Sequence, residues 1–411
     1  MNDKPTPPSL PVGVNKASMT ELVPFASHKI HLFRNKFFIP GFLIAVTAVV
    51  FLMMPTDNTI GLWLLADYFM FTLFCVIYFY VEIDRPLSLY IIPVAIIYIV
   101  MQVPMWIYPA SCPSGLCGRS VTLWYGIYYA FDALWQGIGL KIVGAGNSVP
   151  QNVASMFAQP GLREEFVKAI PALIAAGLTV AEAPAIYALA ILLPPVGLLV
   201  SGQRKTAIIS FILVAVCIFL VIATRTYVPL LILPLQAVIA VAIHRRHRDP
   251  NAKPSKLHEL LRLRDPLDGL MIGIASGLTF TLLENMSQYI PEAGRAAQQH
   301  GGHDTQVLSE LLLLIPRSLD SIIAHFAWAG ISGYFIGLIV LRPQGWPLML
   351  ALGWLVPAFL HGAFDGLLTS NLDWWVLPLD LVSFILFLAC LLKARQLHMA
   401  LFEDGKTAQR E

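Results

Sequence analysis

Long apolar runs constrain this sequence more than any other feature. A helix needs about 20 predominantly apolar residues to cross a bilayer. The clear candidates are 37–55, 60–82, 89–109, 206–223, 226–243, 266–289, 311–341, 347–368 and 374–392. Hydrophobic residues make up 57% of the 411 residues and charged residues only 13%, against roughly 25% charged residues in a soluble domain. The sequence therefore predicts an all-α fold, a polytopic transmembrane helix bundle surrounded by lipid.

Two further stretches are apolar but interrupted. Residues 164–201 are long for one crossing and contain several prolines, from Pro171 to Pro195, so we expect one broken crossing there. Residues 119–141 are aromatic and interrupted by Asp132. They form either a weak span or an amphipathic helix on the membrane surface.

Basic residues set the expected orientation, because cytoplasmic loops of membrane proteins are enriched in Lys and Arg. The block 244–264 is the most basic segment and is assigned to the cytoplasm, as is the basic N-terminus. Alternation of the spans then places 110–163 outside the cytoplasm. The count comes to about ten spans, with both termini in the cytoplasm. If 119–141 and 164–183 each cross, the count becomes about twelve spans and agrees equally well with both termini in the cytoplasm.

The charge composition argues against nucleic acid as a partner, and the cysteine content raises the question of a disulfide. The formal net charge of +2 provides no strong attraction to nucleic acid, and the sequence has no Walker-type phosphate loop. Cys112 and Cys117 lie in one short loop, where they form a disulfide in an oxidising compartment or remain free thiols. A metal or redox site at this pair is the less favoured interpretation.

Ionisable residues interrupt several of the apolar runs. A charge at the bilayer centre costs roughly 2.5–3.5 kcal/mol, so each is a functional candidate. The first group is Glu164, Glu165 and Lys168, in which helical spacing lets Lys168 pair with either acid. A solvated helix start, with acids at its positive end, is the alternative for this group.

Glu284 and Asn285 follow an apolar run that starts at Pro266. Glu284 is 18 residues beyond Pro266, roughly 27 Å along a helix, near the outer end of an outgoing span. The preceding Gly273 and Gly277 allow a neighbouring helix to approach closely. An interfacial acid at a helix end is the alternative.

Two histidines complete the set. His325 lies in the outer half of an inward-running span and is followed by the small residues Gly330 and Gly333. His361 and Asp365 have i, i+4 spacing, which places them on one helix face. The alternatives are a packing histidine and a His–Asp pair that joins helices. In the ten-span arrangement all these groups lie in the outer half of the membrane, where the first glutamate pair joins them only if 119–141 does not cross.

Four motifs in this order resemble those of the PrsW family of intramembrane proteases, which is related to the CAAX prenyl endopeptidases. They span about 160–370 and are Glu164-Glu165-x-x-Lys168, Phe280-x-x-x-Glu284-Asn285, Arg317 followed by His325, and His361-x-x-x-Asp365. The resemblance implies an endopeptidase in the bacterial inner membrane that cuts a membrane-associated protein, such as an anti-sigma factor, on the outer side. It also implies catalytic roles for Glu164, Glu165, Glu284, His325 and His361, and supporting roles for Lys168, Asn285, Arg317 and Asp365.

With this resemblance the chain divides into five expected segments. They are a polar cytoplasmic N-terminal segment at 1–36, three transmembrane helices at 37–109, an extracytoplasmic loop or surface helix at 110–163, a catalytic transmembrane core at 164–395 and a cytoplasmic tail at 396–411. The active site is expected between helices in the outer half of the membrane. The expected partners are the lipid bilayer and a membrane protein substrate, with no nucleic acid.

Two chemical routes fit these residue types. A glutamate in a low-dielectric cavity can take a proton from water and later give it to the leaving amine, while a histidine, Lys168 or Asn285 stabilises the oxyanion. The other route is a zinc ion held by His325, His361 and a carboxylate. The sequence has no His-Glu-x-x-His motif, so we favour the glutamate route without a cofactor and keep zinc as the alternative.

Two other function classes use similar residues. A proton-coupled secondary transporter also places Glu, His and Asp within the membrane as a relay, although no symmetry between two halves of the chain is visible. A non-catalytic membrane scaffold would retain the same residues for structure alone.

Overall fold

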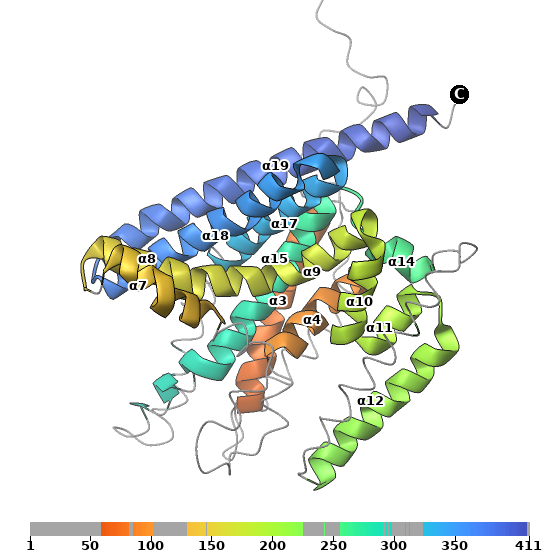
Figure 1. Cartoon of the computed structure of the whole chain (residues 1–411), viewed down its shortest axis with the longest axis horizontal. Helices are drawn as coiled ribbons and strands as arrows, with labels where there is room; N and C mark the ends of the chain where they lie inside the picture. The colour runs from red at the N-terminus through yellow and green to blue at the C-terminus, as the bar shows by residue number, and fades with distance from the viewer. Residues whose placement is uncertain are drawn as a thin grey trace, which may run out of the picture. The chain divides into compact units, whose positions relative to one another are not determined.

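The structure is a computed structural model of the 411-residue chain. It describes residues 59–81, 85–101, 130–144, 146–224, 242, 255–290, 292–294, 296–297, 309, 312 and 324–408. Within these residues all regular structure is helical and includes 13 α-helices (Figure 1). The all-α fold class is therefore confirmed for this part of the chain. Residues 1–68 and 69–411 form two compact units, and the account below concerns the second.

Several helices coincide with the expected spans. Three are long and apolar enough to cross a membrane, at Pro266–Glu284, Pro343–Thr369 and Asp373–Leu401, and shorter apolar helices occur at Ile91–Met101, Glu182–Leu192 and His325–Leu341. Helices α3 (Thr59–Val81) and α12 (Arg204–Thr224) also match expected runs. The chain is a multi-pass integral membrane protein, while the number of about ten spans stays a prediction.

Some expectations concern residues that the structure does not describe. The predicted spans 37–55 and 226–243, the loop with Cys112 and Cys117, and Arg317 all lie outside the described residues. The predicted span 311–341 is described from residue 324 onward as α17 (His325–Leu341), apart from two isolated positions.

The apolar helix Ile91–Met101 and the shorter helical elements complete the described part of the chain. They are η3 (Leu87–Tyr90), α4 (Ile91–Met101), η4 (Trp135–Gly139), α7 (Leu140–Val143), α14 (Lys256–Leu261), η6 (Asn285–Tyr289), η7 (Pro343–Gly345) and η8 (Asp373–Trp375).

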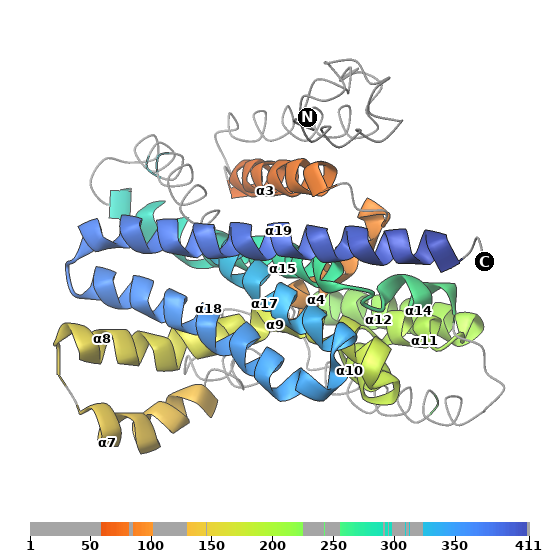
Figure 2. The same ribbon diagram turned by 90° about the horizontal axis from the view of Figure 1, so that it is seen from above.

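The helix that carries Glu164 and Glu165 begins well before them. It runs through α8 (Val149–Met156), the π-helix η5 (Phe157–Gly161) and α9 (Leu162–Val180) without a break (Figure 2). Its start is fixed by a capping box between Ser148 and Gln151, which satisfies backbone N–H groups of the first turn. The glutamates therefore lie in the middle of a long helix rather than at a solvated helix start.

The stretch 164–201, expected to be one broken crossing, consists of three helices, and whether it crosses the membrane stays a prediction. After α9 the chain continues in α10 (Glu182–Leu192) and α11 (Pro194–Val200). The breaks fall at Ala181 and Leu193, which both leave helical geometry. Pro194 lies at the start of α11, where a residue without a backbone N–H is tolerated.

Helices α15 (Pro266–Glu284) and α17 pack backbone to backbone at the centre of the bundle. A Cβ atom on Gly273 would lie 2.1 Å from the carbonyl oxygen of Ala329, and one on Gly333 would lie 2.1 Å from that of Gly269. Small residues permit this close approach in membrane proteins. The tight contact expected from the glycine spacing is confirmed.

Helix α18 (Trp346–Thr369) runs along the α8–α9 helix. Gly362 is in contact with the backbone of Phe157, and Gly366 with that of Val153. The indole N–H of Trp354 donates to the carbonyl of Leu162 at 2.8 Å. These contacts place His361, one residue before Gly362, beside the turn that carries Glu164. Helix α19 (Val376–Ala408) then continues as one helix through residue 396.

Candidate active site

Four helices bring the ionisable residues of the apolar runs together. The side chains that meet are Glu164, Glu165 and Lys168 from α9, Glu284 from α15, His325 from α17, and His361 and Asp365 from α18. Residues as far apart in the sequence as Glu164 and Asp365 therefore form one cluster. This convergence is what a shared site requires.

Glu165 and Lys168 form the buried base of the cluster. Both residues are 0% exposed, and the Lys168 Nζ lies 2.7 Å from Glu165 Oε1. The Lys168 ammonium also lies over the ring of Phe280, 4.5 Å from its centroid. A buried charge is costly unless it is paired and hydrogen-bonded, and these contacts meet that requirement.

Both ring nitrogens of His361 face carboxylate oxygens. Its Nδ1 lies 3.0 Å from Glu165 Oε1, while its Nε2 lies 3.6 Å from Glu164 Oε2 and 3.4 Å from Asp365 Oδ2. The indole ring of Trp328 stacks against the imidazole at 4.7 Å with an interplanar angle of 21°. The ring plane of His361 is therefore fixed.

His325 faces His361 from the neighbouring helix. The Nδ1 of His325 lies 2.6 Å from Lys168 Nζ, and its Nε2 lies 3.6 Å from Glu284 Oε2. The two imidazole rings are 4.9 Å apart in an edge-to-face arrangement. Lys168 thus connects the two histidines, directly to one and through Glu165 to the other.

A polar cavity of about 390 Å³ opens onto one side of the cluster. That volume lies in the range of about 300–1,000 Å³ typical of ligand sites. Its lining includes Arg163, Glu164, Glu284, Tyr289, His325, His361, Asp365 and Thr369, but neither Glu165 nor Lys168. The cavity therefore separates reachable groups from buried supporting groups.

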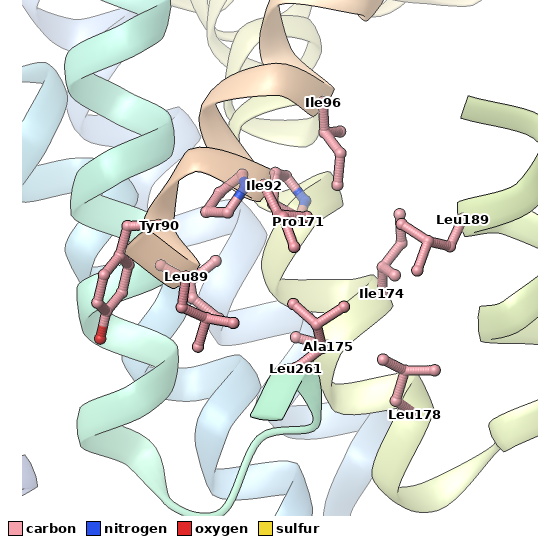
Figure 3. A pocket seen from close by; sticks show the side chains of 12 residues that line it. Leu89, Tyr90, Ile92, Ile96, Pro171, Ile174, Ala175, Leu178, Leu189 and Leu261 are labelled. Carbon is pink, nitrogen blue, oxygen red and sulfur yellow. The ribbon is translucent and has the colours of Figure 1, made fainter. Parts of the chain in front are cut away.

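A second pocket, lined in part by residues further along α9, is different in character. It measures about 20 Å³ and is lined by apolar side chains, with Tyr90 as the exception (Figure 3). A buried water needs two to four polar partners, which this pocket does not supply. The chemistry of the described residues is therefore centred on the polar cavity.

The sequence reasoning missed some contributors to the site. Trp328 was not singled out as a site residue, yet it is 0% exposed and stacks on His361. Its position three residues after His325, on the same helix face, is the signal that could have identified it. Arg163 and Tyr289 also line the cavity. Asn285 is buried but does not line it.

One group of side chains has the composition of a metal site. Ligand atoms of Glu164, His325 and His361 all lie within 4.8 Å of one another. Two imidazoles and a carboxylate are ligand types suited to zinc with one open position. The contact between Lys168 and His325 fits this interpretation poorly, because an ammonium group has only donors and occupies the Nδ1 lone pair.

The fold and the cavity define a class of protein. It is a multi-pass integral membrane protein whose packed helices enclose a cluster of glutamate, histidine and lysine side chains.

Comparisons with known proteins show that part of this chain is similar to a known family. Residues 235–392 match the sequence model of the "PrsW family intramembrane metalloprotease". A stretch of 109 residues is 28% identical to "Protease PrsW" of Shouchella clausii (strain KSM-K16), which corresponds to 26% of this chain and 43% of that relative. The match therefore spans less than half of the relative's length. No solved structure matches the chain. The resemblance to the PrsW family is confirmed, and residues 235–392 are its PrsW-type segment.

The structure connects this segment with the first motif. The match contains Glu284, His325 and His361 but begins after Glu164 and Glu165. Because α9 packs against α15, α17 and α18, the glutamate pair reaches the histidines of the matched segment. The site therefore combines residues from inside and outside it.

Proposed function

We propose that this protein is an intramembrane endopeptidase that hydrolyses a membrane-associated protein with a water molecule activated by Glu164. The observation that carries the proposal is the polar cavity in which Glu164 meets both histidines within the helix bundle. The match to the PrsW family supports the reaction class.

Glu164 is the carboxylate best placed to activate water. It lines the cavity, and its Oε2 has no hydrogen-bond partner although it is buried. The same oxygen lies 3.6 Å from His361 Nε2. A water molecule in the cavity can hydrogen-bond to both atoms. A water bound between them would give its proton to Glu164 as it attacks the peptide carbonyl, and Glu164 would return the proton to the leaving amine.

The other residues have distinct roles in this mechanism. His361 orients the water, and His325, on the opposite wall, donates to the oxyanion that develops on the carbonyl. Glu165 and Lys168 do not touch the cavity and act as positioning residues. Glu284 and Asp365 orient the exposed sides of the two histidines. Asn285 and Arg317 keep their proposed supporting roles.

A zinc-dependent reaction is the second candidate. The description of the matched family as a metalloprotease and the cluster of Glu164, His325 and His361 favour it. Those three residues would hold the ion, and a bound zinc ion lowers the pKa of its water to about 7. The Lys168 contact argues against His325 as a ligand, so we favour the glutamate route.

The site of action follows the same reasoning. Apolar helices surround the cavity, so the scissile bond must enter the membrane or lie at its surface. We propose a single-span membrane protein of the bacterial inner membrane as substrate, cut near the outer surface. An anti-sigma factor fits this description.

The test is cleavage of a single-span reporter protein reconstituted into lipid vesicles with the full chain. Glu164→Gln keeps the shape of the side chain and removes its basicity, so we expect the cleavage rate to fall by about 10²- to 10⁴-fold. Glu259→Gln is the matched control, because Glu259 is an exposed glutamate on α14. Wild-type cleavage by the Glu164→Gln variant would refute the proposal. Proton-coupled solute flux without cleavage would favour the transporter instead.

A further inference from the structure

Lys168 is a buried lysine whose donors are directed at named atoms. Its side chain is 0% exposed, and so is that of Glu165. The ammonium nitrogen lies 2.7 Å from Glu165 Oε1 and 2.6 Å from His325 Nδ1, with the face of Phe280 at 4.5 Å. A carboxylate and an aromatic face both favour the charged form of lysine.

The contact with Lys168 fixes the direction of the hydrogen bond at His325. An ammonium group has three donors and no acceptor. The Nδ1 of His325 must therefore accept, which leaves the ring proton of the neutral imidazole on Nε2. That N–H lies on the side of Glu284, at 3.6 Å from its Oε2, where the cavity begins.

The contact with Glu165 fixes the opposite direction at His361. The same oxygen of Glu165, Oε1, receives the Lys168 ammonium at 2.7 Å and faces His361 Nδ1 at 3.0 Å. An ionised carboxylate only accepts, so His361 Nδ1 carries a proton. Its Nε2 faces two further carboxylates, those of Glu164 and Asp365, and nearby negative charge favours a proton on Nε2 as well.

We propose that the buried Lys168–Glu165 pair sets opposite hydrogen-bond directions at the two histidines. His325 Nδ1 accepts from Lys168 and His361 Nδ1 donates to Glu165, so that His325 is neutral and presents its Nε2–H to the cavity. This inference rests on the proposed function for its catalytic meaning, because it supplies a donor for the oxyanion. The tautomers themselves can be measured without any substrate.

The arrangement also decides whether the cluster suits zinc. A histidine binds zinc through an unprotonated nitrogen. His325 does not meet that condition, because Lys168 occupies its lone pair and the nitrogen that faces the cavity carries a proton. The residue types fit a two-histidine zinc site, but the hydrogen-bond directions do not. We infer that His325 is not a metal ligand in this protein.

The direct test is ¹⁵N NMR of the full chain, labelled on histidine and held in lipid vesicles. The signals are assigned with His325→Gln and His361→Gln. We expect His325 to be protonated on Nε2 only and His361 to carry a proton on Nδ1. Protonation of both rings on Nδ1, as a zinc site requires, would overturn the inference.

Variants of Lys168 and Glu165 test whether this pair determines the protonation of the two histidines. Lys168→Arg keeps a permanent donor at this position and should retain both tautomers. The double variant Lys168→Met with Glu165→Leu removes the two charges together, which avoids an unpaired buried charge, and His361 should lose its fixed Nδ1–H signal. Lys393→Met, on an exposed lysine of α19, is the control. Unchanged tautomers in a folded double variant would overturn the inference; if this variant does not fold, the wild-type and Lys168→Arg spectra decide.

A zinc titration of the wild-type protein separates this inference from the proposed function. The Nε2–H signal of His325 should persist when one equivalent of Zn²⁺ is added, and its loss would overturn the inference. If the tautomers are as expected but no reporter is cleaved, the proposed function fails while the inference holds. If the reporter is cleaved and the tautomers differ, the inference alone fails.

Discussion

At the scale of single residues, burial separates two adjacent glutamates. Neighbouring residues on a helix point about 100° apart, so Glu164 lines the cavity while Glu165 turns toward Lys168 and is 0% exposed. The Glu164 carboxylate can exchange protons with water in the cavity, whereas the Glu165 carboxylate does not line the cavity. In the proposed mechanism the pair therefore divides into a reacting group and a positioning group.

This division predicts different losses of stability for the two glutamates. Glu165→Ala leaves the buried Lys168 ammonium without its closest anion, and breaking such a pair costs about 3–5 kcal/mol. Glu164→Ala removes a group at the cavity wall, and the loss should be clearly smaller. Unfolding of the two variants in mixed detergent micelles measures both values. Equal losses would contradict the assigned roles.

The sequence identified the ionisable residues of the site but not which of them face the cavity. Charged residues are conspicuous in apolar runs because burial is costly, so Glu164, Glu284, His325 and His361 could be selected. Which of Glu164 and Glu165 faces the cavity depends on how α9 is rotated against α18. The contacts of Trp354 and Gly362 fix that rotation, and one sequence does not reveal such pairings.

At the scale of helices, α15 is the central element. Its residues Pro266 to Leu283 are all buried, and it delivers Glu284 at one end. At the other end Asp265 caps the helix by accepting from the backbone N–H groups of Leu267 and Asp268. Its close packing on α17 determines how far Glu284 lies from His325.

The glycine face of α15 gives the first prediction for this helix. Gly273→Ala adds a Cβ atom that would lie 2.1 Å from the Ala329 carbonyl, so α15 and α17 must separate. We expect lower thermal stability and reduced cleavage. Gly345→Ala is the matched control, because the nearest atom to its added Cβ is 4.0 Å away. A Gly273→Ala variant as stable as the control would show that the contact is looser than described.

The cap of α15 gives the second prediction. Burial by itself would raise the pKa of Asp265, but hydrogen bonds from His398 and from the backbone outweigh burial, so the pKa lies below its usual value. The stabilisation is therefore present above the unfolded pKa, about 3.9, and is lost as the pH falls through the lower folded value. Asp265→Asn retains a capping side chain but cannot titrate.

The measurement for this prediction is thermal stability at pH 6 and pH 3. Wild-type protein should lose more stability over this interval than Asp265→Asn. At pH 6 the variant should be less stable, because the charge-assisted contact with His398 at 2.8 Å is weakened. Identical pH profiles would contradict a role for the Asp265 carboxylate.

At the scale of the whole molecule, hydropathy predicts where helices form but not how they are joined. The expected spans at 206–223 and 347–368 correspond closely to α12 and α18, because uninterrupted apolar sequence of this length is unambiguous. Residues 149–161 were expected within an extracytoplasmic loop or surface helix, and in the structure they form a helix that continues into α9. Their lower hydrophobicity concealed their packing against α18.

Long-range ion pairs were also beyond prediction. The guanidinium of Arg85 pairs with Asp268, and both side chains are almost fully buried. The same guanidinium donates to the backbone carbonyls of Leu260 and Arg262. More than 170 positions separate these partners, and no local spacing rule connects them. The pair ties the segment before α4 to the start of α15.

The central claim is hydrolysis by a water held on Glu164 without a metal ion. Its most direct measurement is single-turnover cleavage of the reporter in ¹⁸O-labelled water, by full-length protein freed of metal with a chelator. We predict that one ¹⁸O atom enters the new carboxylate at the untreated rate, and that Glu164→Gln abolishes the labelling. Cleavage that stops after chelation and returns with zinc would contradict the account.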